Sequence, residues 1–483
     1  MRPRISPWWW ALGLILGLRL VSMAWLPLAG TSEPRYAEVA RLMAVTGDWI
    51  TPWFTPDQPF WGKPPLSFWT EALAFRLLGV TELAARLPSW LATLGSMGLL
   101  FVYARRFFGE RIAQGAVLIY ATCALVYIAS GAVITDPFLA LATTWAMVAL
   151  ALSAKTRHPA WRYGFFVALA LGLLAKGPLM LVLVAGPLLP LVILYPSIRS
   201  AFKQLPWLGG LALMLLLSAP WYLLAELKTP GFLNYFLVGE HFLRFIDSGW
   251  AGDLYGVAHR RIKGAIWADA LMASFPWGLV ALALLLRQLW NPVKRSALWQ
   301  MRRDPDKAYL VAWTLFTPAF FSLSDNILWT YMLPALAPFS VLLALALAPA
   351  QASSKVARRL LVALTSLVPL ALTAYMVLGV LDPLRLKTEK HLVAYAMHQM
   401  QAEDKLLYLN EIPFSATFYS RGQAGAITLK ELTRQTRPTH RLYLALPKDD
   451  LNRVSKILNQ PLKPLFESHE FVLTEIAGRP NNP

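Results

Sequence analysis

The sequence predicts an all-α polytopic membrane protein with a small α/β domain at its C-terminal end. The chain is 57% hydrophobic and only 15% charged, whereas soluble proteins carry about 25% charged residues. Several apolar runs reach the roughly 20 residues that an α-helix needs to cross a bilayer. Beyond residue 383 these long runs stop, and shorter strand-like and helical segments alternate. The membrane is therefore expected to solvate most of the chain.

Charge distribution excludes nucleic acid as the partner. The net charge is +18, but the 45 Lys and Arg residues are scattered through short loops between apolar runs. A nucleic-acid-binding protein gathers them on one basic domain. The single cysteine, Cys123, excludes an intrachain disulfide. The basic residues before the run 8–28 resemble a signal peptide, but this run is long and lacks a clear small-residue cleavage site, so a retained first helix is expected.

Apolar runs of helical length predict eleven membrane helices, within a range of about 11 to 13. They lie near 8–28, 83–105, 112–128, 134–153, 161–175, 178–195, 206–224, 266–288, 309–324, 327–348 and 358–381. The segment 161–195 is interpreted as a hairpin that breaks at Lys176-Gly177-Pro178. One continuous helix would put the basic loop 287–308 on the outer side.

Basic residues mark alternate connections between these helices. They occur in the N-terminus (Arg2, Arg4) and in 105–111, 154–162, 196–205, 287–308 and 350–359. The positive-inside rule makes these connections cytoplasmic. The opposite short turns 129–133 and 325–326 contain no Lys or Arg. The N-terminus is therefore expected in the cytoplasm, with loops 29–82 and 225–265 and the C-terminal tail on the far side.

The tail separates the chain into two predicted domains. Residues 1–382 form the multi-helix membrane domain, including loops 29–82 and 225–265, and residues 383–483 form a small far-side α/β domain. Its expected strands lie near 406–409, 442–446 and 471–473, and its expected helices lie near 391–402 and 449–458.

The first loop contains a dense group of polar residues. Ser32 can cap a helix that begins there, and Glu33 would lie at the positive end of that helix. A capping role and a catalytic role for this pair remain equal alternatives. Arg35, Glu38 and Arg41 recur at three-residue spacing, which is typical of a solvated, ion-paired helix face.

Two further loop residues have chemical and structural interpretations. Lys63 lies among aromatic and proline residues in Phe60-Trp-Gly-Lys-Pro-Pro, a setting that suits either an anionic headgroup or a snorkelling lysine. Asp136 precedes Pro137 at the outer end of a predicted helix. A carboxylate there is a functional candidate because its burial is costly, and the alternative is a helix cap.

All the charged candidates are predicted on one side of the membrane. Lys176 lies in the hairpin turn, and loop 225–265 contains Gly239-Glu-His-Phe-Leu-Arg-Phe. The full set is Glu33, Arg35, Lys63, Asp136, Lys176, Glu240, His241 and Arg244. Scattered structural charges would fall on both sides, so this convergence predicts a site. The sequence contains no phosphate-binding Gly-rich loop, paired-cysteine zinc pattern or His-Glu-x-x-His helix.

Several short motifs occur in an order that resembles a known family. They are Ser32-Glu-Pro-Arg-Tyr-Ala-Glu-Val-Ala-Arg, Gly47-Asp-Trp-Ile, Gly62-Lys-Pro-Pro-Leu-Ser-Phe-Trp, Ala85-Arg-Leu-Pro-Ser, Thr135-Asp-Pro-Phe, Ala175-Lys-Gly-Pro, Pro220-Trp-Tyr, Glu240-His-Phe-Leu-Arg-Phe and Tyr331-Met-Leu-Pro. Over about 30–345 this order resembles the bacterial aminoarabinose transferases of lipid A, within the protein O-mannosyltransferase-like, GT-C class of glycosyltransferases.

The resemblance implies a GT-C-like fold in the bacterial inner membrane and an undecaprenyl-phosphate sugar donor. It also implies a large first periplasmic loop with helices that lie on the membrane. Two positions depart from the family pattern. Ser32 replaces the usual aspartate, and Gly62 replaces the acid that helps some relatives to build a zinc site. The sequence thus assigns no metal site and no certain cofactor, and binding of a divalent metal remains an alternative.

The expected function is transfer of a sugar from polyprenyl phosphate to a lipid A, glycan or protein acceptor. Arg35, Lys63 and Arg244, with Lys176, would stabilise charge on the leaving phosphate. Asp136 and Glu33 are the candidate catalytic carboxylates, which would accept a proton from a hydroxyl acceptor. If the acceptor is a phosphate, it is already ionised and the carboxylate need only orient the substrates. Tyr36, Glu240 and His241 complete the predicted substrate-binding set.

Two other classes of protein remain alternatives. A lipid-linked sugar transporter or flippase also needs many helices, but such proteins are often built from repeated halves with a site at the midplane. The sequence shows no repeat, and its candidate charges gather at one face. A binding or scaffold protein is the third alternative, supported by the serine at position 32.

Overall fold

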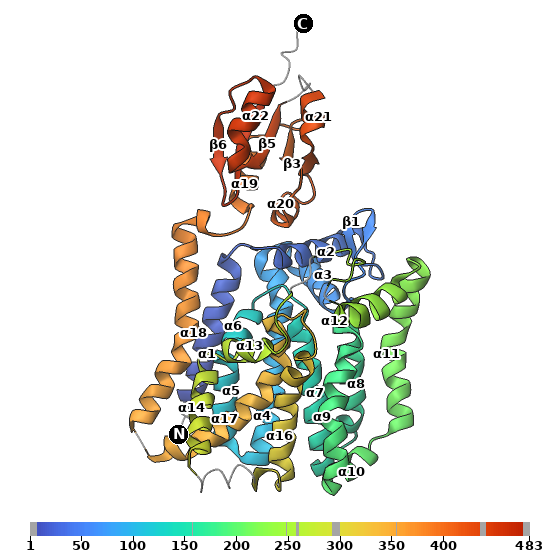
Figure 1. Ribbon diagram of the computed structural model, residues 1–483, viewed down its shortest axis with the longest axis vertical. Helices are drawn as coiled ribbons and strands as arrows, with labels where there is room; N and C mark the ends of the chain where they lie inside the picture. Colours follow the sequence, from blue (N-terminus) through green and yellow to red (C-terminus); the bar gives the residue numbers. More distant parts are fainter. Residues whose placement is uncertain are drawn as a thin grey trace.

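The computed structural model describes residues 7–156, 158–247, 249–256, 260–291, 300–353, 355–434 and 441–476. A bundle of helices forms the larger part, and a small sheet domain lies beyond one end of it (Figure 1). The predicted basic positions Arg2 and Arg4, and the central part of loop 287–308, lie outside the described residues.

Helices occupy all eleven ranges that the apolar runs predict. They are α1 (Pro7–Trp25), α4 (Glu82–Phe108), α5 (Glu110–Thr122), α6 (Ala124–Ala129), α7 (Asp136–Thr156), α8 (Pro159–Lys176), α9 (Leu179–Leu194), α11 (Trp207–Lys228), α13 (Ile266–Ala273), α14 (Trp277–Leu289), α16 (Pro305–Phe321), α17 (Leu333–Ser353) and α18 (Lys355–Leu381). The short helix α10 (Pro196–Lys203) joins α9 to α11, and η2 (Trp329–Met332) precedes α17.

Two of the predicted helices are interrupted. The range 112–128 breaks at Cys123 between α5 and α6, and the range 266–288 bends by 112° between α13 and α14. Among the described residues, six helices are long and apolar enough to cross a membrane alone, or up to seven if the bent pair counts as one span. The other predicted spans are helices that are shorter or less apolar. Membrane crossing by all eleven therefore rests on the apolar pattern of the sequence.

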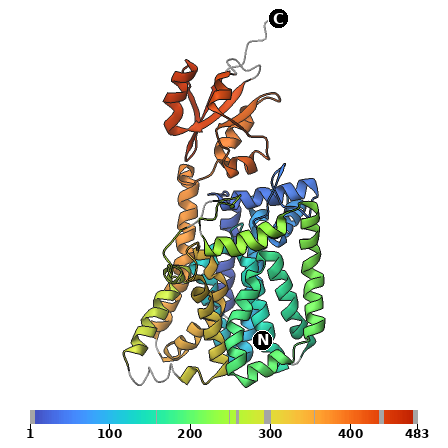
Figure 2. The same cartoon turned by 45° about the vertical axis from the view of Figure 1, so that its right-hand side comes forward.

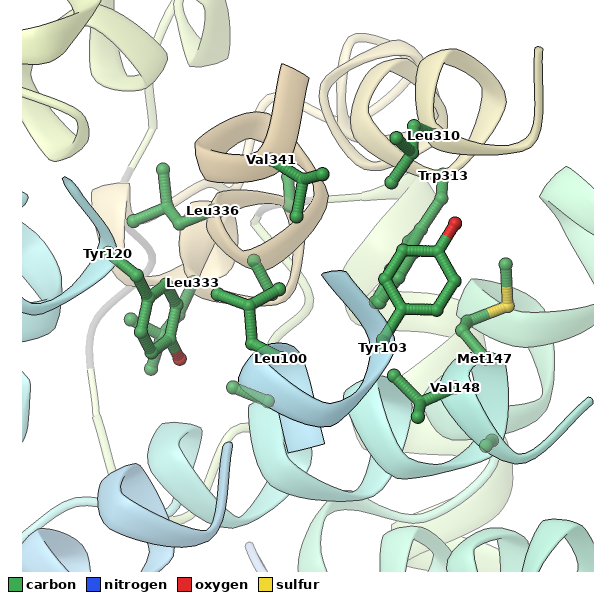
Figure 3. Close-up of a cluster of buried hydrophobic side chains, with 14 of the residues drawn as sticks. Leu100, Tyr103, Tyr120, Met147, Val148, Leu310, Trp313, Leu333, Leu336 and Val341 are labelled. Carbon is green, nitrogen blue, oxygen red and sulfur yellow. The ribbon is translucent and has the colours of Figure 1, made fainter. Parts of the chain in front are cut away.

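The core of the bundle lies where α4, α5, α7, α16 and α17 meet. Leu100 and Tyr103 of α4 face Met147 and Val148 of α7 and side chains of α16 and α17 (Figure 3). These side chains are almost completely buried. Close packing of this kind, rather than water exclusion, holds helices together in a lipid environment.

Helices α8 and α9 form the predicted hairpin. Gly177 ends α8 with a φ of 70°, a left-handed conformation that favours glycine. Gly172 allows the close approach of α9, because a β-carbon there would lie 2.2 Å from the Met180 side chain. The break after Lys176 is therefore confirmed.

The first loop folds into helices α2 (Ser32–Thr46) and α3 (Leu66–Leu78) and the short paired strands β1 (Trp53–Thr55) and β2 (Gln58–Pro59). Helix α2 begins at Ser32, so Thr31 takes the cap position and the predicted Ser32 cap is wrong by one residue. Glu38 and Arg41 form the predicted ion pair, at 2.6 Å. The pair is buried rather than solvated, because the C-terminal domain covers it near Gly422.

The C-terminal domain is a five-stranded mixed sheet with strand order β4-β3-β5-β7-β6. Strands β3 (Lys405–Leu409), β4 (Gly425–Ile427) and β5 (Leu442–Pro447) are parallel, and β7 (Phe471–Ile476) is antiparallel to β5 and β6 (Pro464–Glu467). Its helices are α19 (Lys390–Gln399), α20 (Phe414–Tyr419), α21 (Leu429–Arg434) and α22 (Leu451–Leu458). The strands and helices predicted in the tail are all present.

The first loop and the C-terminal domain lie at the same end of the bundle. Figure 1 shows α2 and α3 across the top of the helices, directly below α20, with α10 at the opposite end. The π-helix η1 (Asn234–Leu243) and the short helix α12 (Arg244–Ile246) from loop 225–265 run crosswise beneath the first loop (Figure 2). Residues far apart in the sequence thus meet at this end.

Candidate active site

A cavity of about 690 Å³ lies at this end, between the first loop, the upper ends of α7 and α8, η1 and the segment before α17. Every residue of the predicted site lines it except Glu33. These residues are Arg35, Tyr36, Lys63, Asp136, Lys176, Glu240, His241 and Arg244. The convergence inferred from topology is therefore present as a single concave surface.

Glu240 connects two cations of the cavity. Its carboxylate accepts hydrogen bonds from Lys63 Nζ at 2.9 Å and from Arg244 Nη1 at 2.6 Å. Burial alone would raise the pKa of Glu240, but these two cations outweigh it and lower the pKa. Burial likewise opposes the charge on Lys63, but Glu240 raises the pKa of this lysine overall. Both groups are therefore charged at neutral pH, and Lys63 is held by a carboxylate rather than only reaching for the interface.

Asp136 and Lys176 form a second ion pair, at 2.6 Å. Helix α7 begins at Asp136 and helix α8 ends at Lys176, and the packing of α7 against α8 brings these two helix ends together. Asp136 is the first helical residue rather than the residue before it, so the helix-cap alternative does not match its position. The lysine ammonium group also lies 5.1 Å from the centre of the Tyr331 ring.

His241 connects the crosswise helix η1 to the end of α8. Its Nδ1 lies 2.7 Å from the carbonyl oxygen of Phe236, and its Nε2 lies 3.0 Å from the carbonyl oxygen of Lys176. Burial lowers the pKa of His241, and a neutral ring donates to only one of these oxygens. The contacts fit a residue that fixes the backbone around Lys176.

Arg35 enters the cavity from α2. Its Nη1 donates a hydrogen bond of 2.6 Å to the carbonyl oxygen of Tyr255. Its guanidinium carbon lies 5.2 Å from the centre of the Tyr36 ring and 5.8 Å from that of Phe414. Stacking of this kind orients an arginine while its other donors stay available.

Glu33 lies outside the cavity. Its two carboxylate oxygens accept hydrogen bonds from Arg86, at 3.0 and 2.8 Å, and one of them also accepts a bond from the backbone N–H of Val133. Arg86 is only 4% exposed and also donates to the carbonyl oxygens of Met23 and Pro27. This placement favours the structural alternative for Glu33 over the catalytic one.

Sequence reasoning did not select Tyr255, Tyr331 or Phe414 as site residues, although all three line the cavity. Tyr331 lies in one of the recognised motifs, so its position there could have indicated it. Phe414 belongs to the C-terminal domain, and nothing in its local sequence indicates that it reaches the membrane domain.

The donor set of the cavity does not fit a divalent metal. Within the described ranges no group of three His, Cys, Asp or Glu side chains could hold a metal ion. Glu240 is engaged by two cations, and both nitrogens of His241 face carbonyl oxygens.

Charge is unbalanced around the cavity. Four cationic side chains line it, from Arg35, Lys63, Lys176 and Arg244, against the two carboxylates of Asp136 and Glu240. The described lining therefore carries a formal excess of two positive charges, and Asp253, which pairs with Arg244 at 3.2 Å from outside the lining, reduces this excess to one. Such a site attracts an anion and lowers the energy of negative charge that develops inside it.

Comparison with known proteins agrees with the family that the sequence motifs resemble. Residues 62–223 match the family described as dolichyl-phosphate-mannose-protein mannosyltransferase. The chain is 31% identical over 351 residues to undecaprenyl phosphate-alpha-4-amino-4-deoxy-L-arabinose arabinosyl transferase 1 of Pseudomonas fluorescens, covering 69% of this chain and 57% of that protein. It is 32% identical over 348 residues to the corresponding transferase of Aeromonas hydrophila, covering 69% of this chain and 59% of the relative.

The crystal structure of ArnT from Cupriavidus metallidurans bound to undecaprenyl phosphate has the same fold. It matches with a TM-score of 0.76 and 18% identity, covering 99% of this chain and 100% of that one. The chain belongs to the aminoarabinose-transferase-like family. The GT-C-like fold and the small C-terminal sheet domain expected from the sequence are thus confirmed for this multi-span membrane protein.

The match to the family is incomplete in length. The chain spans less than two thirds of the curated relatives that it matches, 57% and 59% of the two transferases above. The family assignment therefore establishes the fold, whereas the geometry of the cavity is the basis for the reaction.

Proposed function

We propose that this member of the aminoarabinose-transferase-like family is a membrane glycosyltransferase that takes a sugar from a polyprenyl-phosphate donor. The observation that carries the proposal is the excess of positive charge among the side chains of a single cavity. The cavity continues into an apolar wall that suits a prenyl chain. This wall includes Leu179, Val182, Leu237, Phe320, Phe321 and Leu328.

The reaction is an inverting transfer. An acceptor oxygen attacks the anomeric carbon while the bond from that carbon to the phosphate oxygen breaks, and polyprenyl phosphate leaves with the electron pair. Lys63, Arg35 and Arg244 stabilise the charge that develops on the leaving phosphate, together with Lys176. Each interaction of this type is worth roughly 100- to 1000-fold in rate when its donor is preorganised.

The carboxylates of the cavity favour an acceptor that is already ionised. Asp136 is held by Lys176, and Glu240 is held by Lys63 and Arg244, so neither is a free base. Glu33 lies outside the cavity, and Ser32 occupies the position of the family's usual acid. A phosphate group, as on a lipid A-type acceptor, needs no general base, and Asp136 would then orient the substrates through Lys176.

The arrangement of charge supports a fixed orientation in the inner membrane. The cavity, the first loop and the sheet domain share one end, and basic residues such as Arg105, Arg106 and Arg199 belong to the connections at the other (Figure 1). By the positive-inside rule the N-terminus is cytoplasmic and the cavity faces the periplasm. The division into a membrane domain, 1–382, and a periplasmic domain, 383–483, belongs to the same proposal.

The transporter alternative is disfavoured by the position of the cavity. A transport site lies near the bilayer midplane between repeated halves, whereas this cavity lies at one end of the bundle beneath the first loop. The cavity therefore lacks the midplane position that is expected for a polytopic lipid-linked sugar flippase.

A turnover assay tests the proposal directly. Purified full-length protein is incubated with radiolabelled polyprenyl-phosphate sugar and a lipid A-type acceptor, and labelled product and released polyprenyl phosphate are counted. Equal amounts of both products are expected, and Asp136→Asn is expected to reduce both. Binding or transbilayer movement of the donor without either product would overturn the transferase assignment.

A further inference from the structure

The C-terminal domain contributes a side chain to the cavity. Phe414, the first residue of α20, lines the cavity although it lies more than 80 positions beyond the other lining residues in the sequence. Its ring contacts the Phe54 ring of the first loop, with centroids 5.5 Å apart. The domain is thus part of the wall of the site rather than a separate appendage.

Contacts around α20 hold Phe414 in a fixed position. One turn further along the helix, Phe418 is 3% exposed and packs in the same apolar core as α2, α3 and the start of α4. The Tyr419 hydroxyl donates a hydrogen bond to Glu82 at 3.0 Å and accepts one from the backbone N–H of Leu28 at 2.7 Å. Lys390 forms an ion pair with Glu82 at 2.6 Å. Such packing on a helix positions a side chain more narrowly than a free loop can.

Phe414 and Tyr36 both lie close to the guanidinium group of Arg35. The distances from the guanidinium carbon to the ring centres are 5.8 and 5.2 Å. Arg35 uses Nη1 on the Tyr255 carbonyl oxygen, and its buried Nε has no hydrogen-bond partner among the described residues. The aromatic rings therefore supply the orientation that hydrogen bonds to other side chains would otherwise give.

We propose that Phe414 is a positioning residue, through which the C-terminal domain holds Arg35 toward the phosphate of the lipid-linked substrate. The inference rests on the proposed function, because it takes that phosphate as the ligand of Arg35. An arginine loses side-chain entropy when it grips an anion, and a guanidinium group that an aromatic ring has already ordered loses less. The domain thus raises affinity for the phosphate without touching it.

A pair of substitutions separates the effect of the aromatic face of Phe414 from the effect of its apolar bulk. Phe414→Leu keeps apolar packing against Phe54 but removes the aromatic face, and Phe414→Tyr keeps the face. The Kd of the full-length protein for undecaprenyl phosphate is measured in detergent, with the KM for the donor. We expect Phe414→Leu to raise both by roughly 3- to 30-fold, the range of a partly desolvated cation–π contact. Phe414→Tyr should stay close to the wild type, and kcat should change less than KM.

A double-mutant cycle with Arg35→Ala decides whether Phe414 acts through that residue. If it does, Phe414→Leu has no further effect on the Kd once Arg35 is gone. Phe418→Leu is the matched control on the same helix, and it should lower the apparent melting temperature without coupling to Arg35. Additive effects, or a normal Kd in Phe414→Leu, overturn the positioning role. Failure of the wild type to bind undecaprenyl phosphate would instead overturn the proposed function.

Discussion

The cavity and the seat of the C-terminal domain contain similar charged residues in opposite situations. We define the seat as Glu33, Glu82, Arg86, Lys390 and Tyr419, where the first loop, α4 and the C-terminal domain meet. In the seat each charged group has protein partners; the Arg86 guanidinium group, for example, donates hydrogen bonds both to Glu33 and to backbone carbonyl oxygens. In the cavity four cations share the carboxylates of Asp136 and Glu240, and Asp253 pairs with Arg244 from outside the lining.

The difference separates structural charges from chemical ones. A buried ion pair whose hydrogen bonds are complete has no capacity left for a ligand, and its removal leaves an uncompensated charge. A cluster with excess charge of one sign is expensive to maintain without an anion and is typical of a functional site. This difference in charge balance therefore assigns a structural role to Glu33 in the seat and a chemical role to Lys63 in the cavity, although both residues lie in the same polar loop.

The largest expected effect is on the seat. Arg86→Met keeps the length of the side chain but leaves the Glu33 carboxylate buried without its cation. Breaking one partner of a buried pair costs about 3–5 kcal/mol, so the protein should lose most of its thermal stability in detergent. The measurement is the apparent melting temperature together with the monodisperse fraction on size exclusion.

Arg105→Met is the control for this substitution. Arg105 pairs with Glu110 at 3.4 Å, and both side chains are more than half exposed. Exposed pairs contribute about 0–1 kcal/mol, so this variant should keep its melting temperature. Equal stability of the two variants would contradict the structural assignment of the seat.

The next effect concerns the cavity. Lys63→Ala removes a cation and leaves Glu240 paired with Arg244, so the fold should survive. Loss of one preorganised charge-stabilising donor typically costs roughly 100- to 1000-fold. That decrease is expected in kcat/KM at least as strongly as in kcat, since the phosphate is charged in both the ground state and the transition state.

Lys228→Ala is the matched control, because Lys228 at the end of α11 pairs with Asp48 of the first loop, and neither residue lines the cavity. It should leave donor transfer unchanged. If Lys63→Ala changes only the yield of membrane-inserted protein, the snorkelling alternative for Lys63 is correct.

Sequence patterns were sufficient for the helices and for the side on which the candidates gather. Apolar runs depend on bilayer thickness, and the break at Gly177 depends on a residue that adopts positive φ. The pairing of Glu33 was not predictable, because its partner Arg86 is more than 50 residues away and local capping rules suggested another role. Phe414 was beyond reach for the same reason, since docking of one domain on another leaves no periodic pattern.

A smaller effect tests the disputed residue itself. Glu33→Gln keeps the shape of the side chain but replaces a charged hydrogen bond to Arg86, so stability should fall by roughly 1–3 kcal/mol. Turnover per folded molecule should stay near that of the wild type. Ser32→Asp is the companion variant, because Ser32 lines the cavity and the Arg86 pair is left intact. A large loss of turnover in Glu33→Gln without a change in melting temperature would restore its catalytic role.

The smallest expected effect is a pH dependence at the edge of the seat. Glu389, at the start of α19, accepts hydrogen bonds from Ser468 at 2.9 Å and Tyr408 at 3.3 Å. Burial raises the pKa of Glu389 to about 7 from its ordinary value of 4.5, although these bonds oppose the rise. Between these values the folded domain keeps a proton that the unfolded chain releases. The contribution of Glu389 to the stability of the domain is therefore fully present below pH 4.5 and is lost as the pH rises through 7.

Calorimetric melting of the full-length protein at a series of pH values measures this dependence. The melting temperature of the C-terminal domain should decrease on the order of a few degrees over that pH interval. Glu389→Gln should flatten the plot of melting temperature against pH, because an amide does not titrate. Glu467→Gln is the control: its side chain is 54% exposed and pairs with Lys448 on the outside of the sheet, so the curve should keep its slope. A wild-type curve that rises with pH would mean that Glu389 is held as a carboxylate. The edge of the seat would then resemble the cavity, because it would carry a charge that its hydrogen-bond partners do not neutralise.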